Sequence, residues 1–284
     1  MALLQSICRT ARRTLVATGL DRPLAALGWP LPKALRPYAD EYPKPSLRRA
    51  RRHGIEFALD PSDFVQWLTY MGAENDQRER LLGLAQRGMT VIDVGANIGD
   101  TLLSIGQRVG PQGKVIGFEA NPETLKKCQA NIALNAMTQV GVEGVALGAA
   151  AGMLGFGRAA SGNSGADRFM PGGGGVITVP LITLDSYVSE AVLDHIDLIK
   201  IDVEGFEMNV LRGADATLAK FRPVLFLELC DANLREQGSS AVELLAWLEA
   251  RGYAIEDVLE GRAVTAADPG NIIFTDIICR PCAA

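Results

Sequence analysis

A regular alternation of short apolar strands with amphipathic helices begins after Gly54, and it constrains the fold of this chain more than any other feature. Strands are predicted at 89–94, 114–119, 141–147, 176–182, 196–202, 223–229, 252–257 and 271–278. Helices are predicted at 99–109, 122–136, 183–189, 207–220 and 239–251. Strands such as Leu-Ile-Lys-Ile at 198–201 are typical of a parallel sheet covered by helices on both faces. The pattern therefore predicts an α/β fold with a doubly wound, mostly parallel sheet, which binds its ligand beyond the carboxyl ends of the strands.

The first 53 residues differ from the rest in charge and in proline content. We expect residues 1–53 to form a basic, proline-rich N-terminal extension before a single domain at 54–284. Residues 1–55 contain eleven Lys/Arg and three acidic residues, a net charge of +8 that leaves −13 for the remainder of a chain of net charge −5. Apolar residues at helical spacing predict an amphipathic helix over 3–18, and six prolines between positions 23 and 45 exclude a long helix after it.

Two interpretations of this extension stay open. It is a peripheral anchor on acidic lipid or a contact for an anionic partner, or it is a solvated helix packed on its own domain or on a second subunit. Between the extension and the sheet, a strand is predicted at 55–59 and helices at 63–71 and 74–87.

Composition excludes several classes of protein. A pI near 5.2 argues against a protein that coats nucleic acid, and no apolar run approaches the roughly 18–20 residues that span a bilayer. The five cysteines are scattered, and the C-R-P-C sequence at 279–282 stands where the chain ends, whereas a redox pair is expected where a strand enters a helix. Free thiols and a cytoplasmic location are therefore expected.

The first chemical signal is a glycine-containing turn between the first sheet strand and its helix. Its notable residues are Asp93, Gly95, Asn97 and Gly99. Glycines leave room for a ligand against the backbone, and amides at a helix start bind carboxylates or phosphates. Glu119, at the end of the next strand, can accept hydrogen bonds from both hydroxyls of a ribose. These residues predict a ligand that contains adenosine.

The spacing within the turn favours S-adenosylmethionine over a dinucleotide. A dinucleotide fingerprint reads G-x-G-x-x-G, whereas this turn reads G-x-N-x-G. The carboxylate of Asp93 would repel a pyrophosphate but suits a ligand that carries an ammonium group.

Together these motifs resemble those of the FkbM-type methyltransferases, an S-adenosylmethionine-dependent family with a Rossmann-like fold. The resemblance spans roughly residues 55–278 and is carried by the segments 93–99, 118–122, 131–135, 183–185, 196–207 and 210–213. The family more often has proline where this chain has Ala120. The resemblance implies a seven-stranded, mostly parallel sheet of the class I methyltransferase type, with S-adenosylmethionine as cofactor.

The resemblance also implies roles for individual residues. The turn from Asp93 to Gly99 would bind the methionine end of the cofactor and Glu119 its ribose, while the strand end at Ala146 and Leu147 would line the adenine. Neighbouring residues are expected to contribute to the same cofactor site, namely Thr101, Ala120 and Asn121. Asn163 lies in a segment that resembles a loop over the active-site mouth of relatives, and it would contact the substrate.

Acidic residues follow the fourth and fifth strands of the predicted sheet. Alternation places Lys200 and Asp202 on one face of their strand, and Asp202, Glu204 and Glu228 are expected to meet at the carboxyl edge beside the transferred methyl group. Together with Lys200 they are the candidate catalytic residues, and the acids would help to remove the proton that a hydroxyl releases on methylation. The three carboxylates would also suit a hard divalent ion such as Mg²⁺. Pairing with Lys200 or capping of the following helix is the alternative role.

The sequence thus predicts an O-methyltransferase that modifies a hydroxyl of a sugar, a glycan or a small natural product. No nucleic-acid partner is expected, and a homo-oligomer is left open. Two alternatives remain. An NAD-type oxidoreductase is disfavoured by the missing third glycine and by the lack of a Tyr-Lys or His proton relay. A non-catalytic nucleoside-binding module is disfavoured by the intact acids Asp202 and Glu204.

Overall fold

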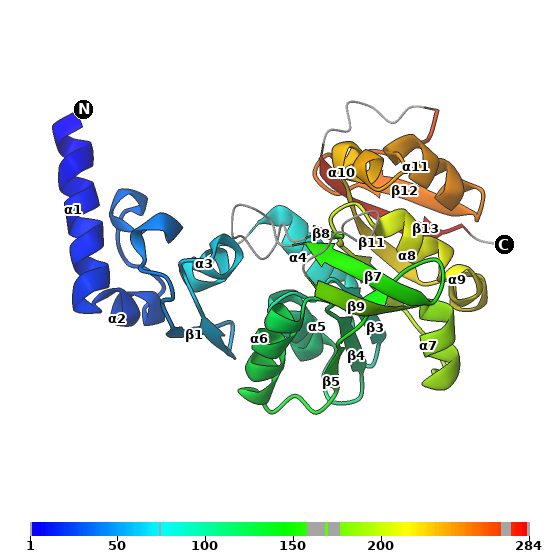
Figure 1. Ribbon diagram of the computed structural model, residues 1–284, viewed down its shortest axis with the longest axis horizontal. Coiled ribbons are helices and arrows are strands. Elements are labelled where there is room, and N and C mark those ends of the chain that lie inside the picture. The colour runs from blue at the N-terminus through cyan, green and yellow to red at the C-terminus, as the bar shows by residue number, and fades with distance from the viewer. Residues whose placement is uncertain (1, 74, 158–167, 170–176, 268–273, 283–284) are drawn as a thin grey trace.

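The computed structural model describes residues 2–73, 75–157, 168–169, 177–267 and 274–282. Its central sheet consists of β3 (Thr90–Val94), β4 (Lys114–Phe118), β5 (Val140–Glu143), β10 (Leu198–Ile201), β11 (Val224–Leu229), β12 (Tyr253–Asp257) and β13 (Thr275–Pro281). The strand order is β12-β13-β11-β10-β3-β4-β5, and β13 runs opposite to the other six strands (Figure 1). The structure confirms the α/β fold with a seven-stranded, mostly parallel sheet.

Helices cover both faces of this sheet. They are α4 (Asp76–Leu84), α5 (Asp100–Val109), α6 (Pro122–Ala133), α7 (Leu184–Glu190), α8 (Glu207–Arg212), α9 (Asp215–Phe221), α10 (Asp231–Glu236) and α11 (Ala241–Glu249). Because side chains alternate along a strand, Val91 packs in the cluster that contains α4, α5 and α6, whereas Ile92 and Val94 pack in the cluster that contains α7 to α11. Both faces are therefore apolar, as the strand composition predicts.

A second, four-stranded sheet lies beside the central one. It consists of β6 (Ala146–Leu147), β7 (Gly152–Gly157), β8 (Arg168–Phe169) and β9 (Ile177–Ile182), in the order β6-β9-β7-β8. The single strand predicted at 141–147 is wrong, because the chain leaves the central sheet after β5 and pairs Ala146 and Leu147 with β9. The predicted strand at 176–182 corresponds to β9 and belongs to this second sheet.

Other predicted elements also differ from the structure. The helix predicted at 207–220 is divided into α8 and α9 at Gly213, which packs against the backbone after β6: a Cβ at Gly213 would lie 2.0 Å from the backbone oxygen of Gly148. The short helix α10 was not predicted. Cys279 is fully buried in β13, whereas Cys282, which follows this strand, is exposed.

The N-terminal extension packs through a hairpin and a helix onto the domain. The elements within residues 1–53 are α1 (Ala2–Thr18), α2 (Asp21–Ala26), the 3₁₀ helices η1 (Lys33–Leu35) and η2 (Ala39–Glu41), and β1 (Arg48–Arg52). The hairpin partner β2 (Ile55–Leu59) and the helix α3 (Phe64–Met71) follow them. The arginine-rich segment Arg48–Arg52 thus forms a strand, β1, that pairs with β2. The boundary predicted between residues 53 and 54 falls in the turn of this hairpin. Trp29, Tyr42 and Tyr70 belong to the same apolar cluster as Leu102 of α5.

Two asparagines of the 131–135 segment attach β2, the hairpin partner of β1, to the rest of the domain. The side-chain oxygens of Asn135 and Asn131 accept hydrogen bonds from the backbone N–H groups of Glu56 and Ala58 in β2, at 2.9 and 2.8 Å. The side-chain nitrogen of Asn131, which is fully buried, also donates to the backbone oxygen of Ile98 in the glycine turn, at 2.9 Å.

None of the helices in the described part of the chain is long and apolar enough to cross a bilayer.

Candidate active site

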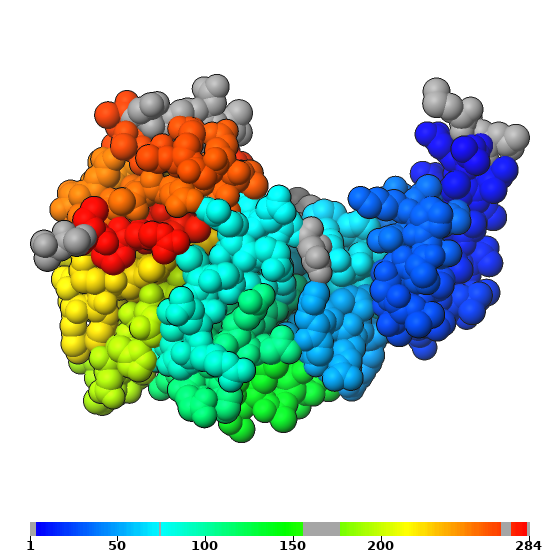
Figure 2. All heavy atoms as spheres, turned by 180° about the vertical axis from the view of Figure 1, so that it is seen from behind, coloured from blue at the N-terminus to red at the C-terminus, as the bar shows by residue number. Residues whose placement is uncertain are grey.

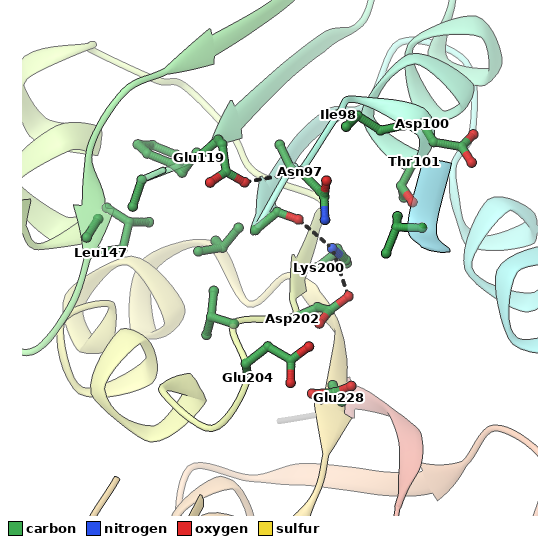
Figure 3. Close-up of a pocket in the computed structure, with 18 of the residues that line it drawn as sticks. Asn97, Ile98, Asp100, Thr101, Glu119, Leu147, Lys200, Asp202, Glu204 and Glu228 are labelled. Atoms are coloured by element: carbon green, nitrogen blue, oxygen red, sulfur yellow. Dashed lines mark hydrogen bonds and ion pairs between the residues drawn. The ribbon is translucent and has the colours of Figure 1, made fainter. Parts of the chain in front are cut away.

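A cavity of about 450 Å³ opens at the carboxyl ends of the central strands, where a doubly wound sheet is expected to bind its ligand (Figure 3). The structure brings most of the predicted site residues together in its wall: Gly95, Asn97, Thr101, Glu119, Ala120, Ala146, Leu147, Lys200, Asp202, Glu204 and Glu228. Asp93, Gly99 and Asn121 do not line it, and Asn163 lies outside the described residues.

The glycine turn follows β3 directly and forms part of the cavity wall. Gly95 has a φ of 82°, and a Cβ there would lie 1.9 Å from the backbone oxygen of Asp202. Only glycine allows the turn to approach the end of β10 this closely. The side-chain oxygen of Asn97 is buried and has no hydrogen-bond partner within the described chain. It could therefore accept a hydrogen bond from a ligand N–H.

Glu119 follows β4 and is only 9% exposed. Its Oε2 accepts a hydrogen bond from the backbone N–H of Asn97 at 2.9 Å, and its Oε1 accepts one from the N–H of Asn121 at 2.8 Å. Burial raises the pKa of Glu119 to about 7, although these two amides lower it. Each carboxylate oxygen keeps a further lone pair. The geometry therefore fits the two hydroxyls of a ribose.

The residues around Glu119 divide into structural and cavity-lining ones. The side chain of Asn121 caps α6 by accepting a hydrogen bond from the N–H of Glu123 at 2.9 Å, which keeps it from the cavity. On the other side of Glu119, Ala146 and Leu147 of β6 present buried apolar side chains to the cavity. An apolar slot of this kind suits a flat adenine ring.

Lys200 connects the glycine turn with the acidic rim. Its Nζ donates to the backbone oxygen of Gly95 at 3.0 Å and forms an ion pair with Asp202 at 3.3 Å (Figure 3). It also forms an ion pair with Asp93 at 3.2 Å. Burial alone would lower the pKa of Lys200, but the carboxylates of Asp202 and Asp93 raise it above its ordinary value. The three donors of this ammonium are matched by three acceptors. Lys200 therefore holds the glycine turn and Asp202 in position. Asp93 forms an ion pair with Lys200 but does not line the cavity.

Three acids line the rim below Lys200, and each has a different environment. Asp202 is held by Lys200. Glu204, at a φ of 53°, accepts a hydrogen bond from the side chain of Asn233 at 3.0 Å. In Glu228 the Oε2 atom is buried without a hydrogen-bond partner among the described residues. Burial, followed by the nearby charges of Asp202 and Glu204, raises the pKa of Glu228 to about 9.

The structure does not support the metal site predicted at this rim. Within the part of the chain that the structure describes, no three His, Cys, Asp or Glu side chains lie close enough to hold a metal ion. Glu207, which starts α8, accepts hydrogen bonds from the N–H groups of Val203 and Gly205 at 3.1 Å each and so stabilises the loop that carries Glu204.

Sequence reasoning did not single out several residues in or beside the cavity wall, of which Val65, Leu68 and Asp276 matter most here. Val65 and Leu68 of α3 line the cavity, but their helical spacing is that of any helix packed on a core. Asp276 of β13 stands directly opposite Glu228 in the antiparallel register. Burial raises the pKa of Asp276 to about 7, and the charge of Asp202 adds to this effect. No spacing in the sequence brings positions 228 and 276 together, because the pairing of β13 with β11 is non-local.

The sheet and the site define a class of protein. A dinucleotide-binding sheet is parallel throughout in the order 3-2-1-4-5-6, whereas here the antiparallel β13 is inserted between β11 and β12. This arrangement is typical of class I S-adenosylmethionine-dependent methyltransferases, and Asn97, Glu119 and the slot at Leu147 fit that cofactor. More narrowly, the chain belongs to the FkbM methyltransferase family, whose domain matches residues 93–255, more than half of the chain.

The chain is also similar to individual proteins, each over part of its length. A 2-O-methyltransferase, NoeI, of Sinorhizobium fredii is 28% identical over 163 residues, which cover 51% of this chain and 65% of that protein. Methyltransferase 1 of Beauveria bassiana is 29% identical over 185 residues, covering 58% and 72%. Among solved structures, the FkbM methyltransferase of Methylobacillus flagellatus superposes with a TM-score of 0.44 at 15% identity, over 76% of this chain and 52% of that one. The chain thus spans just under two thirds of NoeI and about half of the crystallised FkbM protein.

Proposed function

We propose that the protein transfers the methyl group of S-adenosylmethionine to a hydroxyl of a sugar, a glycan or a small natural product. The observation that carries the proposal is that a single cavity contains the ribose-type carboxylate Glu119 at one end and the acidic rim at the other. The name of the relative NoeI, a 2-O-methyltransferase, supports a hydroxyl as the acceptor. A cytoplasmic location is part of the same proposal.

Each part of the cavity matches one part of the cofactor. Gly95 and Asn97 would bind the methionine end, Glu119 would accept hydrogen bonds from the ribose, and the apolar pair at the end of β6 would contact the adenine. Thr101 and Ala120 complete the wall. The methyl group would then face the rim formed by the ends of β10 and β11.

When bound, the cofactor supplies an electrophilic methyl group. The protein must orient the acceptor hydroxyl in line with that group and remove its proton as the new C–O bond forms. Glu228 is the rim acid best suited to accept this proton, because its buried Oε2 has no other described partner and its raised pKa makes it the strongest base when ionised. Asp202, held by Lys200, would orient the hydroxyl.

The test uses S-adenosylmethionine labelled in its methyl group and a panel of acceptors that carry hydroxyls, amines or carboxylates. The proposal predicts label in a methyl ether, which resists alkaline hydrolysis, on a sugar or related polyol. Label found only on amines, or only in alkali-labile methyl esters, would contradict it. Binding of NAD without binding of S-adenosylhomocysteine would favour the oxidoreductase alternative instead.

A further inference from the structure

The outer half of α1 exposes two large apolar side chains on one side of the helix. α1 stands at the end of the molecule opposite the central sheet (Figures 1 and 2). Leu4 is 68% exposed and Ile7 is 56% exposed. Both lie on one side of the helix, and no described part of the chain covers them.

The inner half of the same helix is anchored to the extension. Arg12 forms a two-pronged ion pair with Glu41, at 2.7 and 2.9 Å, and donates to the backbone oxygen of Ala34 at 2.9 Å. Val16, one turn further on, is buried. The outer turns of α1 therefore extend from an inner half that these contacts hold in place.

The charge of α1 complements an anionic surface. The helix contains three arginines and no acidic residue, and the extension as a whole carries +8 while the rest of the chain carries −13. Arg9 and Arg13 are exposed and lie on the side of the helix away from Leu4 and Ile7. An apolar face with arginines on the other face is typical of helices that lie in a membrane interface.

We propose that the outer half of α1 binds the surface of an anionic lipid bilayer. Leu4 and Ile7 enter the acyl boundary, and Arg9 and Arg13 remain at the level of the headgroups. A lipid surface fits better than a second copy of the chain, because two exposed turns offer far less than the roughly 1,200 Å² that a stable protein interface buries. The domain then works beside the membrane while its cavity stays open to acceptors.

The test is sedimentation of the full chain with vesicles of phosphatidylcholine, alone or mixed with phosphatidylserine. We expect binding to the anionic vesicles only, and weaker binding at high salt. The double variant Arg9→Gln/Arg13→Gln should lower the partition coefficient about 25-fold, since each basic residue near such a surface contributes a factor of about five. Leu4→Ser/Ile7→Ser should lower it at least about tenfold.

A matched control removes two exposed lysines from α6, with Lys126→Gln/Lys127→Gln, and should leave vesicle binding unchanged. Helix content and binding of S-adenosylhomocysteine should be the same in all variants, because the changed residues are exposed. Equal binding to neutral and anionic vesicles, no binding, or an equal loss in the control would each overturn the proposal. A dimer that forms in solution and is lost in Leu4→Ser/Ile7→Ser, without vesicle binding, would assign this face to a second copy.

Discussion

Glu119 both stabilises the backbone around it and faces the cavity, so a substitution there affects the protein and its ligand together. Its oxygens accept the N–H groups of Asn97 and Asn121, and they also face the cavity. Glu119→Ala should therefore weaken binding of S-adenosylhomocysteine by on the order of 2–4 kcal/mol, the value of two hydrogen bonds to a charged group. Calorimetric titration measures this, and Glu123→Ala on the exposed side of α6 is the matched control. Unchanged affinity in Glu119→Ala would remove Glu119 from the site.

The raised pKa of Glu119 makes cofactor binding sensitive to pH. With a pKa of about 7, the carboxyl is mostly protonated at pH 6 and mostly ionised at pH 8. Ribose hydroxyls donate to the ionised form, so the affinity for S-adenosylhomocysteine should rise between these pH values, by up to about tenfold. Titrations of Glu119→Gln, which cannot ionise, should give the same affinity at both pH values. An equally flat profile in the unmodified protein would contradict the assignment.

Glu228 should give the methyl-transfer rate its own pH dependence. Burial and the charges of Asp202, Glu204, Glu207 and Asp276 raise its pKa to about 9. A base acts only when ionised, so kcat should rise about tenfold per unit between pH 7 and pH 8 and level off above pH 9. Glu228→Gln should lower kcat and abolish this rise.

Asp276→Asn provides the matched comparison for Glu228. It removes one neighbouring carboxyl across the strand pair and should move the midpoint of the profile to lower pH. If the unmodified protein has a flat profile from pH 7 to pH 9, Glu228 is not the base.

At the scale of elements, close backbone contacts determine where helices end. Gly213 has an ordinary φ, so glycine is required there by the contact with Gly148, whose backbone oxygen would lie 2.0 Å from a Cβ. Gly213→Ala should lower the free energy of unfolding by about 1–3 kcal/mol, because α8 and α9 must move away from the loop after β6. Gly83→Ala is the control, since Gly83 is exposed in α4 with nothing within 4 Å. It should raise stability by about 0.4–1 kcal/mol. Denaturant unfolding distinguishes the two, and an equal effect of both would contradict the packing argument.

Local patterns predicted the elements that depend on local residues. The apolar run from Val91 to Val94 predicted β3, and the helix predicted from residue 122 begins there as α6. The cap at Asn121 was not predicted, because Asn121 was assigned to the cofactor site. The same patterns predicted that Lys200 and Asp202 share a face, and their ion pair shows that they do.

Features that depend on distant pairing could not be predicted in this way. Ala146 and Leu147 look like the end of one strand, yet they pair with β9, more than thirty residues later in the chain. The neighbourhood of Glu228 and Asp276 likewise depends on β13 inserting beside β11. The sequence likewise does not show that Asp93 is fully buried and forms an ion pair with Lys200.

At the scale of the whole molecule, the extension and the domain share one apolar cluster. Trp29 is 1% exposed, packs edge-on against Tyr70 at 5.9 Å between ring centroids, and lies in the cluster that reaches α5. Trp29→Ala should lower the free energy of unfolding by about 3–5 kcal/mol within one cooperative transition. Because α3 contributes Val65 and Leu68 to the cavity, affinity for S-adenosylhomocysteine should fall as well.

The opposing outcome would be two separate unfolding transitions. In that case Trp29→Ala would leave unchanged the midpoint of the transition that cofactor binding reports. That result would support residues 1–53 as an independent unit and would remove the extension from the architecture of the site. Intrinsic fluorescence and cofactor-linked stabilisation, followed in the same denaturant series, report the two parts separately.

The central claim is that the cavity at the ends of β3, β4 and β10 binds S-adenosylmethionine. Calorimetric titration of the unmodified chain with S-adenosylhomocysteine, and separately with NAD, tests this claim most directly. The structure predicts saturable one-to-one binding of S-adenosylhomocysteine and none of NAD, because the turn lacks the third glycine and β13 interrupts the parallel order. Binding of NAD alone would contradict the account.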